Sequence, residues 1–517
     1  MTQQKTSRTK LKSPQDITPT TQKRTTLELL SGFWPIHNSE LPKFFSISAL
    51  MFCILFIQNV IRATKDSVIN TMVGVESISF LKFWGVLPAA VIFALVYVKL
   101  VNMFKPETLF YVIISTFVGF FALFGIVIYP CHETLHLSKE TANAFVASYP
   151  HLKWFILLAA NWGFSLFYII AELWPNAAFA VLFWQFVNGV SSVDQSKRFY
   201  PMFALFGQTG LFFSGYLLEK QKFWGTYLHN DFGLAQNSNI AATQFVMFVV
   251  TMFGLLSLFF FWFINRCVLE TRANDLVKFK VEKKKKMSVL ESFKFVASSR
   301  YIMLIAVMLT CYGLAINLVE GPWKAMATKM YTNPEDYSAF VGSYLKMTGI
   351  LTLIFVLVGS NIVKWLGWYA AAIITPAMMF VTGVVFFYAA NFQSEFLIGI
   401  CIMIGYDPVM LAIVFGAIQN VVTKSTKYTL FDSTKEMAYV PLDDDLKVKG
   451  KGAVDSIGIK LGKSASAFIQ MSIFFIFPNA TQLSISPYLM VVFIAVCITW
   501  IWAVSKLGKE YESLVRK

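Results

Sequence analysis

The 517-residue chain is 56% hydrophobic and 14% charged, and it contains 52 phenylalanines. One soluble core cannot bury this much apolar surface, so the composition excludes an ordinary globular protein and predicts an all-α integral membrane protein with many spans. The formal net charge of +15 would also suit nucleic-acid binding, a reading that the positions of the charges make unnecessary.

Two groups of six apolar runs follow a polar, basic stretch at 1–42, which lacks the apolar core of a signal peptide and is expected to be a cytoplasmic tail. The N-terminal half covers 43–266 and the C-terminal half 300–506, with a basic cytoplasmic linker at 267–299 and a cytoplasmic tail at 507–517. A membrane-spanning helix needs roughly 20 apolar residues. The twelve predicted spans are 44–64, 80–103, 107–129, 154–190, 200–219, 243–265, 301–322, 341–362, 367–390, 395–422, 452–478 and 486–505. The fourth and tenth are longer than one crossing requires, which predicts tilt, a break or an interfacial extension there.

Lysine and arginine are distributed unequally between the two sides of this bundle. Most of the 44 fall in the termini, in the linker and in the loops near 105, 191–199, 361–366 and 423–451. The loops of the opposite side hold only Lys139, Lys220, Lys222, Lys324 and Lys329. The positive-inside rule therefore predicts that both termini are cytoplasmic, and no nucleic-acid partner is needed to explain the charge.

The two halves repeat weakly. The segment "SFLKFWGVL" opens the second span and "SYLKMTGIL" opens the eighth, so that Lys82 and Lys346 take the same place in each half. Six-span repeats joined by a long linker are typical of transporters that bind their substrate between the halves.

Eleven charged residues lie within or at the edges of the predicted spans, where burial is costly unless the charge is paired or hydrated. They are Arg62, Lys65, Asp66, Lys82, Glu172, Glu320, Lys346, Asp407, Asp455, Lys460 and Lys463. Six of the eleven are positive, and these six come from both halves. A hydrated path lined by lysine and arginine suits an anionic substrate, and phosphates in particular.

Several motifs resemble one transporter family. The segments "TKDSV", "FYIIAELWP", "KRFYPMF", "INLVEGPWK", "KLGKSASAFIQ" and above all "KSTKYTLFDSTKEMAYVPLD" are similar to the nucleotide transporter family of ADP/ATP translocases, which occurs in plastids and obligate intracellular bacteria. The resemblance extends from about residue 33 to the C-terminus. It implies a twelve-span carrier with a major-facilitator-like fold, which exchanges nucleotides across a membrane without a cofactor.

The functional charges of this family fall, by position, on Lys65, Glu172, Glu320 and Lys463. The chain departs from the commoner family pattern near the first of them, at Ala63, where many members have an acid. Such departures are expected to change the shape of the pocket that binds the nucleotide base. ATP/ADP exchange is therefore the leading interpretation, with transport of other nucleotides (GTP and GDP, CTP or UTP) and nucleotide/proton symport as alternatives.

The resulting site hypothesis assigns three roles. The cations expected to bind phosphate are Arg62, Lys65, Lys82, Lys346 and Lys463. The acids expected to pair with them and to take part in gating are Asp66, Glu172 and Glu320. The candidates for base or ribose contacts are Asn59, Asn188, Asn317 and Gln419. The halves would rock around this site and exchange external ATP for internal ADP across a bacterial inner membrane, without hydrolysis and with no obligate protein partner evident.

The pattern "HETLH", which runs from His132 to His136, is a competing motif. In zinc proteases two histidines at this spacing on a helix hold the metal, and the glutamate activates water. Here the motif falls in a predicted loop between the third and fourth spans, and no third ligand is evident. A membrane metalloprotease is therefore a remote alternative, and no metal site is expected.

Overall fold

The computed structural model describes residues 35–233, 235–269, 299–392 and 394–515. The candidate site lies within the larger of two units, residues 42–517. Most of the predicted tail and linker lies outside the described residues. The elements that are described are all helices, as predicted.

The N-terminal half contains six main helices with shorter helical elements between them. They are α2 (Leu41–Met72), α4 (Leu87–Met103), α5 (Pro106–Leu123), α9 (Trp162–Trp174), α11 (Val193–Phe232) and α12 (Ser238–Phe263). The shorter helices are α3 (Ser77–Phe80), α6 (His132–Leu135), α7 (Lys139–Ser148), α8 (Lys153–Ala160) and α10 (Trp184–Val190), with 3₁₀ turns at η1 (Asn38–Glu40) and η4 (Pro150–Leu152). Wider π-helical turns occur at η2 (Leu81–Val86), η3 (Phe124–Ile128), η5 (Pro175–Phe183) and η6 (Ile264–Leu269).

The C-terminal half is built in the same way. Its helices are α14 (Arg300–Met330), α15 (Pro334–Asn391), α16 (Glu395–Ile404), α17 (Pro408–Thr426), α18 (Asp432–Ala438), α19 (Asp444–Ile476) and α20 (Ser486–Val515), with a π-helical turn η8 (Lys427–Phe431) between α17 and α18. Gly367 has a φ of 79° inside α15, so this element is two helices joined at a kink. Glycine allows such a positive φ without a steric penalty.

Polar side chains explain where several helices begin. Ser192, Asn237, Ser299, Ser394 and Asp407 each precede a helix and accept a hydrogen bond from a backbone N–H of its first turn. Those N–H groups have no partner within the helix, and one such cap typically contributes about 1 kcal/mol.

Ten described helical segments are long and apolar enough to cross a membrane, and they coincide with ten of the twelve predicted spans. The predicted spans 200–219 and 452–478 fall in α11 and α19, which are not among these ten segments, although Leu461–Ile476 of α19 is a shorter apolar stretch. Polar residues lower the hydropathy of both helices. Glycine, glutamine and threonine occur in the centre of α11, and lysines in the first half of α19.

The fourth and tenth predicted spans are both broken. Asn161, with non-helical φ and ψ, separates α8 from α9, and Gly405, which is left-handed with a φ of 74°, ends α16 before α17. Both breaks agree with the prediction for these two spans. The prediction of a loop over 423–451 is wrong, because much of this segment is helical. The helix α17 continues through η8 and α18, where the hydroxyls of Thr429 and Thr434 donate hydrogen bonds to backbone carbonyls four residues earlier and so find partners within the helix.

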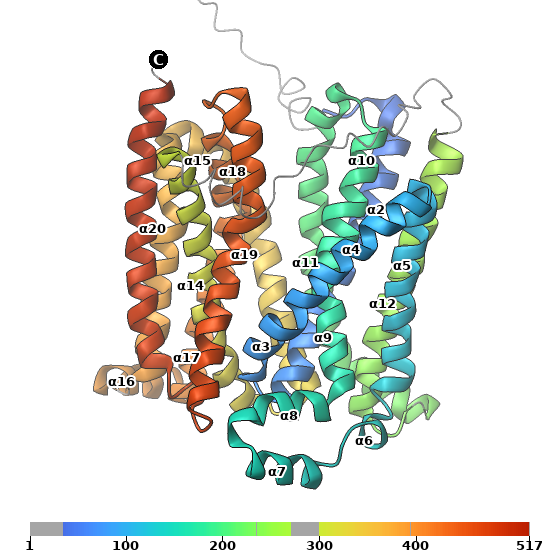
Figure 1. Ribbon diagram of the computed structural model, residues 1–517, viewed down its shortest axis with the longest axis vertical. Coiled ribbons are helices and arrows are strands. Elements are labelled where there is room, and N and C mark those ends of the chain that lie inside the picture. Colours follow the sequence, from blue (N-terminus) through green and yellow to red (C-terminus); the bar gives the residue numbers. More distant parts are fainter. Residues whose placement is uncertain (1–34, 234, 270–298, 393, 516–517) are drawn as a thin grey trace, which may run out of the picture. The chain divides into compact units, whose positions relative to one another are not determined.

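The two halves meet along α11 and α15, which approach each other closely at glycines. A Cβ atom on Gly215 would lie 2.6 Å from the backbone nitrogen of Lys346, and one on Gly342 would lie 2.7 Å from that of Glu219. Such close backbone packing requires small residues. Elsewhere α19 contacts α3 and η2 of the N-terminal half. Figure 1 shows α14, α19 and α20 side by side, and α5 beside α12.

Candidate functional site

Lys65 in α2 is enclosed by groups that compensate its charge. This residue is only 2% exposed, and its Nζ lies 2.6 Å from the carboxylate of Asp66 and 2.8 Å from that of Glu172 in α9. The ammonium also lies 3.9 Å from the centre of the Tyr168 ring. Two carboxylates and an aromatic face thus replace the water that a buried lysine has lost.

Further ion pairs connect Lys65 to the C-terminal half. Lys324 in α14 lies 2.9 Å from Asp66 and 3.7 Å from Glu320, one helical turn earlier, and Glu320 lies 3.1 Å from Lys424 in α17. We call the series Glu172, Lys65, Asp66, Lys324, Glu320 and Lys424 the ion-pair chain. It passes from one half to the other through the contact between Asp66 and Lys324.

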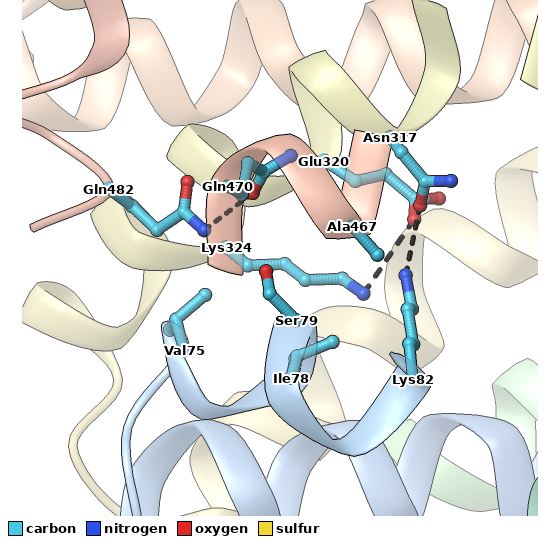
Figure 2. A pocket seen from close by; sticks show the side chains of 11 residues that line it. Val75, Ile78, Ser79, Lys82, Asn317, Glu320, Lys324, Ala467, Gln470 and Gln482 are labelled. Atoms are coloured by element: carbon cyan, nitrogen blue, oxygen red, sulfur yellow. Dashed lines mark hydrogen bonds and ion pairs between the residues drawn. The ribbon is translucent and has the colours of Figure 1, made fainter. Parts of the chain in front are cut away.

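A first pocket lies beside the ion-pair chain, between α3, η2, α14 and α19. Figure 2 shows Lys82 and Lys324 reaching into it from the two halves. The Nζ atom of Lys82 donates a hydrogen bond of 2.9 Å to Asn317 Oδ1, a second polar contact between the halves. At the other end, Gln482 Nε2 donates to Gln470 Oε1 at 2.8 Å. The wall of this pocket is therefore polar and carries two lysines.

A second pocket shares Glu320 and Lys324 with the first. Asn59, Arg62 and Asp66 line it from the N-terminal half, and the side chain of Arg62 is exposed to it. From the C-terminal half it is lined mainly by aromatic and charged residues, namely Glu320, Trp323, Lys324, Tyr337, Tyr344, Lys424 and Tyr428.

Cations outnumber acids in the walls of the two pockets. The cations are Arg62, Lys82, Lys324 and Lys424, and the acids are Asp66 and Glu320. Because unpaired positive charge inside a bundle is costly, this composition favours an occupant with several negative charges. Phosphate groups meet that requirement, since lysine and arginine bind them through charge-assisted hydrogen bonds.

The structure brings together most of the residues singled out from the sequence. Four of them belong to the ion-pair chain, namely Lys65, Asp66, Glu172 and Glu320. The first pocket is lined by Lys82 and Asn317, and the second by Asn59 and Arg62. Lys463 is partly buried in α19, one turn before Ala467 of the first pocket. Among the described residues it has no ion-pair partner, which leaves its ammonium available to an anion.

Three candidates lie elsewhere. Lys346 forms an ion pair with Glu219 in the seam between α15 and α11. The exposed Asn188 accepts a hydrogen bond of 2.5 Å from Tyr200, and the fully buried Gln419 donates to the sulfur of Met379 at 2.9 Å. None of the three lines either pocket. The side chains of Asp455 and Lys460 lie outside the described residues.

Two residues of the ion-pair chain were not expected from the sequence. Lys324 is assigned to a loop because the predicted span ends at residue 322, but α14 continues through Pro322 to Met330. Lys424 is assigned to a cytoplasmic loop, and it is instead only 8% exposed in α17. A usable signal existed for the first: Glu320 and Lys324 are four residues apart, the spacing of an ion pair on one helix face.

The first turn of α15 is bound by side chains from several elements of the N-terminal half. The hydroxyl of Tyr129 donates to the Glu335 carboxylate at 2.8 Å, and Asn70 donates to the hydroxyl of Tyr337 at 2.9 Å. Further contacts there are Ser67 to Pro334, Thr243 and Gln221 to Glu335, and Lys222 to Asp336. The two halves are thus in contact at the C-terminal part of α2 and the first turn of α15.

The "HETLH" motif does not have the geometry of a zinc site. Helix α6 ends at Leu135, so His136 is extended and does not share a helix face with His132. His136 Nε2 accepts a hydrogen bond of 3.2 Å from the Gly163 N–H, and burial, together with the nearby His132 ring, lowers the pKa of His136 to about 4. Within the described ranges, no three His, Cys, Asp or Glu side chains form a group that would hold a metal ion.

Comparison with known sequences identifies close relatives. The model of the family described as TLC ATP/ADP transporter matches residues 20–511. The chain is 55% identical to ADP,ATP carrier protein 4 of Rickettsia bellii (strain RML369-C), over 93% of each chain. It is 54% identical to ADP,ATP carrier protein 4 of Rickettsia felis (strain ATCC VR-1525 / URRWXCal2), over 95% of this chain and 96% of that protein.

Solved structures with a similar fold are distant in sequence. A bacterial homologue of the iron transporter ferroportin aligns with a TM-score of 0.55 and 12% identity, over 89% of this chain and 98% of its own. A mutant of the nucleoside transporter NupG aligns with a TM-score of 0.53 and 9% identity, over 90% of this chain and 99% of its own. At such identities the likeness concerns the fold alone, which is major-facilitator-like.

Proposed function

On the premise that the chain belongs to the TLC ATP/ADP transporter family, we propose that it exchanges external ATP for internal ADP across a bacterial inner membrane. It is a carrier, and no bond of the nucleotide is broken. The observation that carries the proposal is the ion-pair chain, which places paired lysines from both halves around pockets in which cations outnumber acids. The relatives' printed names support adenine nucleotides as the substrates.

The ion-pair chain gives a physical reason for exchange. In the structure the carboxylates of Asp66, Glu172 and Glu320 neutralise the lysines. Phosphate oxygens of an arriving nucleotide would compete with these carboxylates for the same ammonium groups. A state with neither set of partners would leave buried charges unpaired, which is costly. The halves would therefore change orientation readily with a nucleotide bound, and an incoming nucleotide would replace an outgoing one.

In this scheme, cations from both halves bind the phosphates of one nucleotide. Arg62, Lys65 and Lys82 would hold phosphate from the N-terminal half, and Lys463 would do so from the C-terminal half together with Lys324 and Lys424, which the sequence alone does not suggest. Lys346 would contribute only in a state in which it has left Glu219.

The proposed orientation places both termini in the cytoplasm, as the distribution of lysine and arginine predicts. In that orientation the contacts around the first turn of α15 seal the external side. Glu335 is central to this seal, because it is 2% exposed and accepts hydrogen bonds from both Tyr129 and Thr243. Outward opening would have to break these bonds.

Reconstituted vesicles test the proposal. Vesicles loaded with unlabelled ADP should take up labelled ATP, and empty vesicles should not, because exchange needs a counter-substrate. A non-hydrolysable ATP analogue should exchange as well, and dissipating the proton gradient should leave the rate unchanged. Uptake driven by GTP, CTP or UTP in preference to ATP, or uptake that stops without a proton gradient, would overturn the proposal in favour of the other substrates or of symport.

Substitutions in the "HETLH" motif separate the carrier from a hydrolase. Because neither side chain lines a pocket, Glu133→Ala and His132→Ala should exchange ATP and ADP at the wild-type rate and should contain no stoichiometric zinc. The measurements are uptake into vesicles and metal analysis of the purified protein. Loss of a bound zinc ion together with loss of a peptidase activity would revive the metalloprotease.

A further inference from the structure

We propose that the second pocket is the nucleobase subsite, in which the base lies against the rings of Tyr344 and Tyr428. This inference rests on the proposed nucleotide exchange. The cations account for binding of the phosphates, and the second pocket would bind the base. Tyr344 belongs to α15 and Tyr428 to η8, and both are partly buried where they line the pocket. A base offers a flat aromatic face, and such faces stack on tyrosine.

Tyr344 is held in a defined position. The Trp323 ring packs edge-on against it with 5.2 Å between ring centres, and Trp323 is itself only 1% exposed. Its indole N–H donates a hydrogen bond of 3.0 Å to the carbonyl of Ile413, which fixes the indole ring. Tyr344 therefore rests on a rigid wall, and a rigid ring loses little conformational entropy when a ligand stacks on it.

Tyr428 reaches the pocket because of a local change in helix geometry. It lies in η8, where π-helical turns continue α17. Wider turns of this kind change the direction of the side chains that follow them and are frequent at functional sites. Lys427 covers Tyr428 with its ammonium 4.7 Å from the ring centre, and Lys427 is held in turn by Asp432 at 2.8 Å. The ring thus has a fixed cation near it on its own helix.

Lys424 lies between the aromatic and the charged residues that line the pocket. The ammonium of Lys424 lies 5.2 Å from the centre of the Tyr344 ring and 3.1 Å from the carboxylate of Glu320. A nucleotide has the same division, with an aromatic base at one end and phosphates at the other. A nucleotide with its base at Tyr344 would therefore direct its phosphates toward Lys424 and the rest of the ion-pair chain.

Polar groups able to read the edge of a base are also present. Asn59 lines the pocket from α2, and its amide offers one donor group and one acceptor, the combination that pairs with adenine. Within the described part of the chain, the hydroxyls of Tyr344 and Tyr428 have no hydrogen-bond partner. The lining thus offers aromatic rings for the face of a base and polar atoms for its edge.

Leucine and phenylalanine substitutions test the stacking. Tyr344→Leu and Tyr428→Leu should each raise the KM for ADP by about five- to a hundredfold, the range expected when one aromatic partner of a base is lost. The corresponding phenylalanine variants keep the ring and should recover most of that affinity. The matched control is Tyr488→Leu in α20, whose exposed side chain lines neither pocket. Membrane abundance is measured for every variant.

Photolabelling locates the base directly. Purified protein is irradiated with 8-azido-ATP, and the labelled peptides are identified with and without excess ADP. Label that ADP removes should fall on the peptides around Tyr344 or Tyr428. Label confined to other peptides, or leucine variants with the wild-type KM in a protein that exchanges ADP, would overturn this inference. Wild-type vesicles that exchange no adenine nucleotide would instead overturn the proposed function.

Discussion

Lys65→Ala should abolish nucleotide exchange while the protein still reaches the membrane. The substitution removes the cation that lies 2.6 Å from Asp66 and 2.8 Å from Glu172, and among the described residues only Asp66 keeps another ion-pair partner, Lys324. A charge-assisted hydrogen bond to phosphate contributes about 1.5–3 kcal/mol, so its loss alone should weaken nucleotide binding by about ten- to a hundredfold. The carboxylate of Glu172, left without its cation, should oppose binding of the anion further. The measurement is the initial exchange rate against ADP concentration, corrected for membrane abundance.

Lys65→Arg should also lose most of the activity, although it keeps the charge. The Tyr168 ring lies 3.9 Å from the ammonium, so the larger planar guanidinium has no space in the same position. Asp66→Asn should have an intermediate effect, because Lys65 keeps Glu172. The control is Lys329→Ala, a lysine exposed at the end of α14. Wild-type kinetics in both Lys65 variants would show that this lysine does not take part in transport.

The sequence is informative about the spans because hydrophobic length is a local property. Ten predicted spans coincide with long apolar helical segments, and the other two lie in α11 and α19, where polar residues interrupt the apolar pattern. The likeness between "SFLKFWGVL" and "SYLKMTGIL" is equally local. It does not reveal that Lys82 donates to Asn317 whereas Lys346 pairs with Glu219.

The partners within the site depend on tertiary structure and are harder to predict. Glu320 and Lys324 can be paired from their spacing, but their link to Asp66 joins residues 258 positions apart. The tenth predicted span ends at residue 422, just before Lys424. The helix α17 continues past this point to Thr426, and Lys424 is therefore buried. Gln419 has a polar side chain that could bind a base, but in the structure its amide donates a hydrogen bond to the sulfur of Met379.

Lys324→Met should strongly impair exchange and lower the stability of the closed state. Lys324 provides the contact between Asp66 and Glu320, at 2.9 and 3.7 Å, through which the ion-pair chain joins the halves. Without it, Lys65 and Lys424 remain in the chain against the three acids Asp66, Glu172 and Glu320. One carboxylate is then left without a compensating charge within the chain, and a buried unpaired charge is destabilising.

The double variant Asp66→Asn/Lys324→Met should be more stable than Lys324→Met, because Lys65 and Lys424 then balance Glu172 and Glu320. Removing both members of a buried pair is often neutral for stability, so we expect a coupling free energy of about 0.5–3 kcal/mol between the two positions. Thermal unfolding of the four purified proteins gives this value, with Lys329→Met as the control. Transport should not recover in the double variant, since the cation stays absent. Strictly additive losses of stability would mean that Asp66 and Lys324 do not interact, and the connection between the halves would have to lie in other contacts, such as that of Lys82 with Asn317.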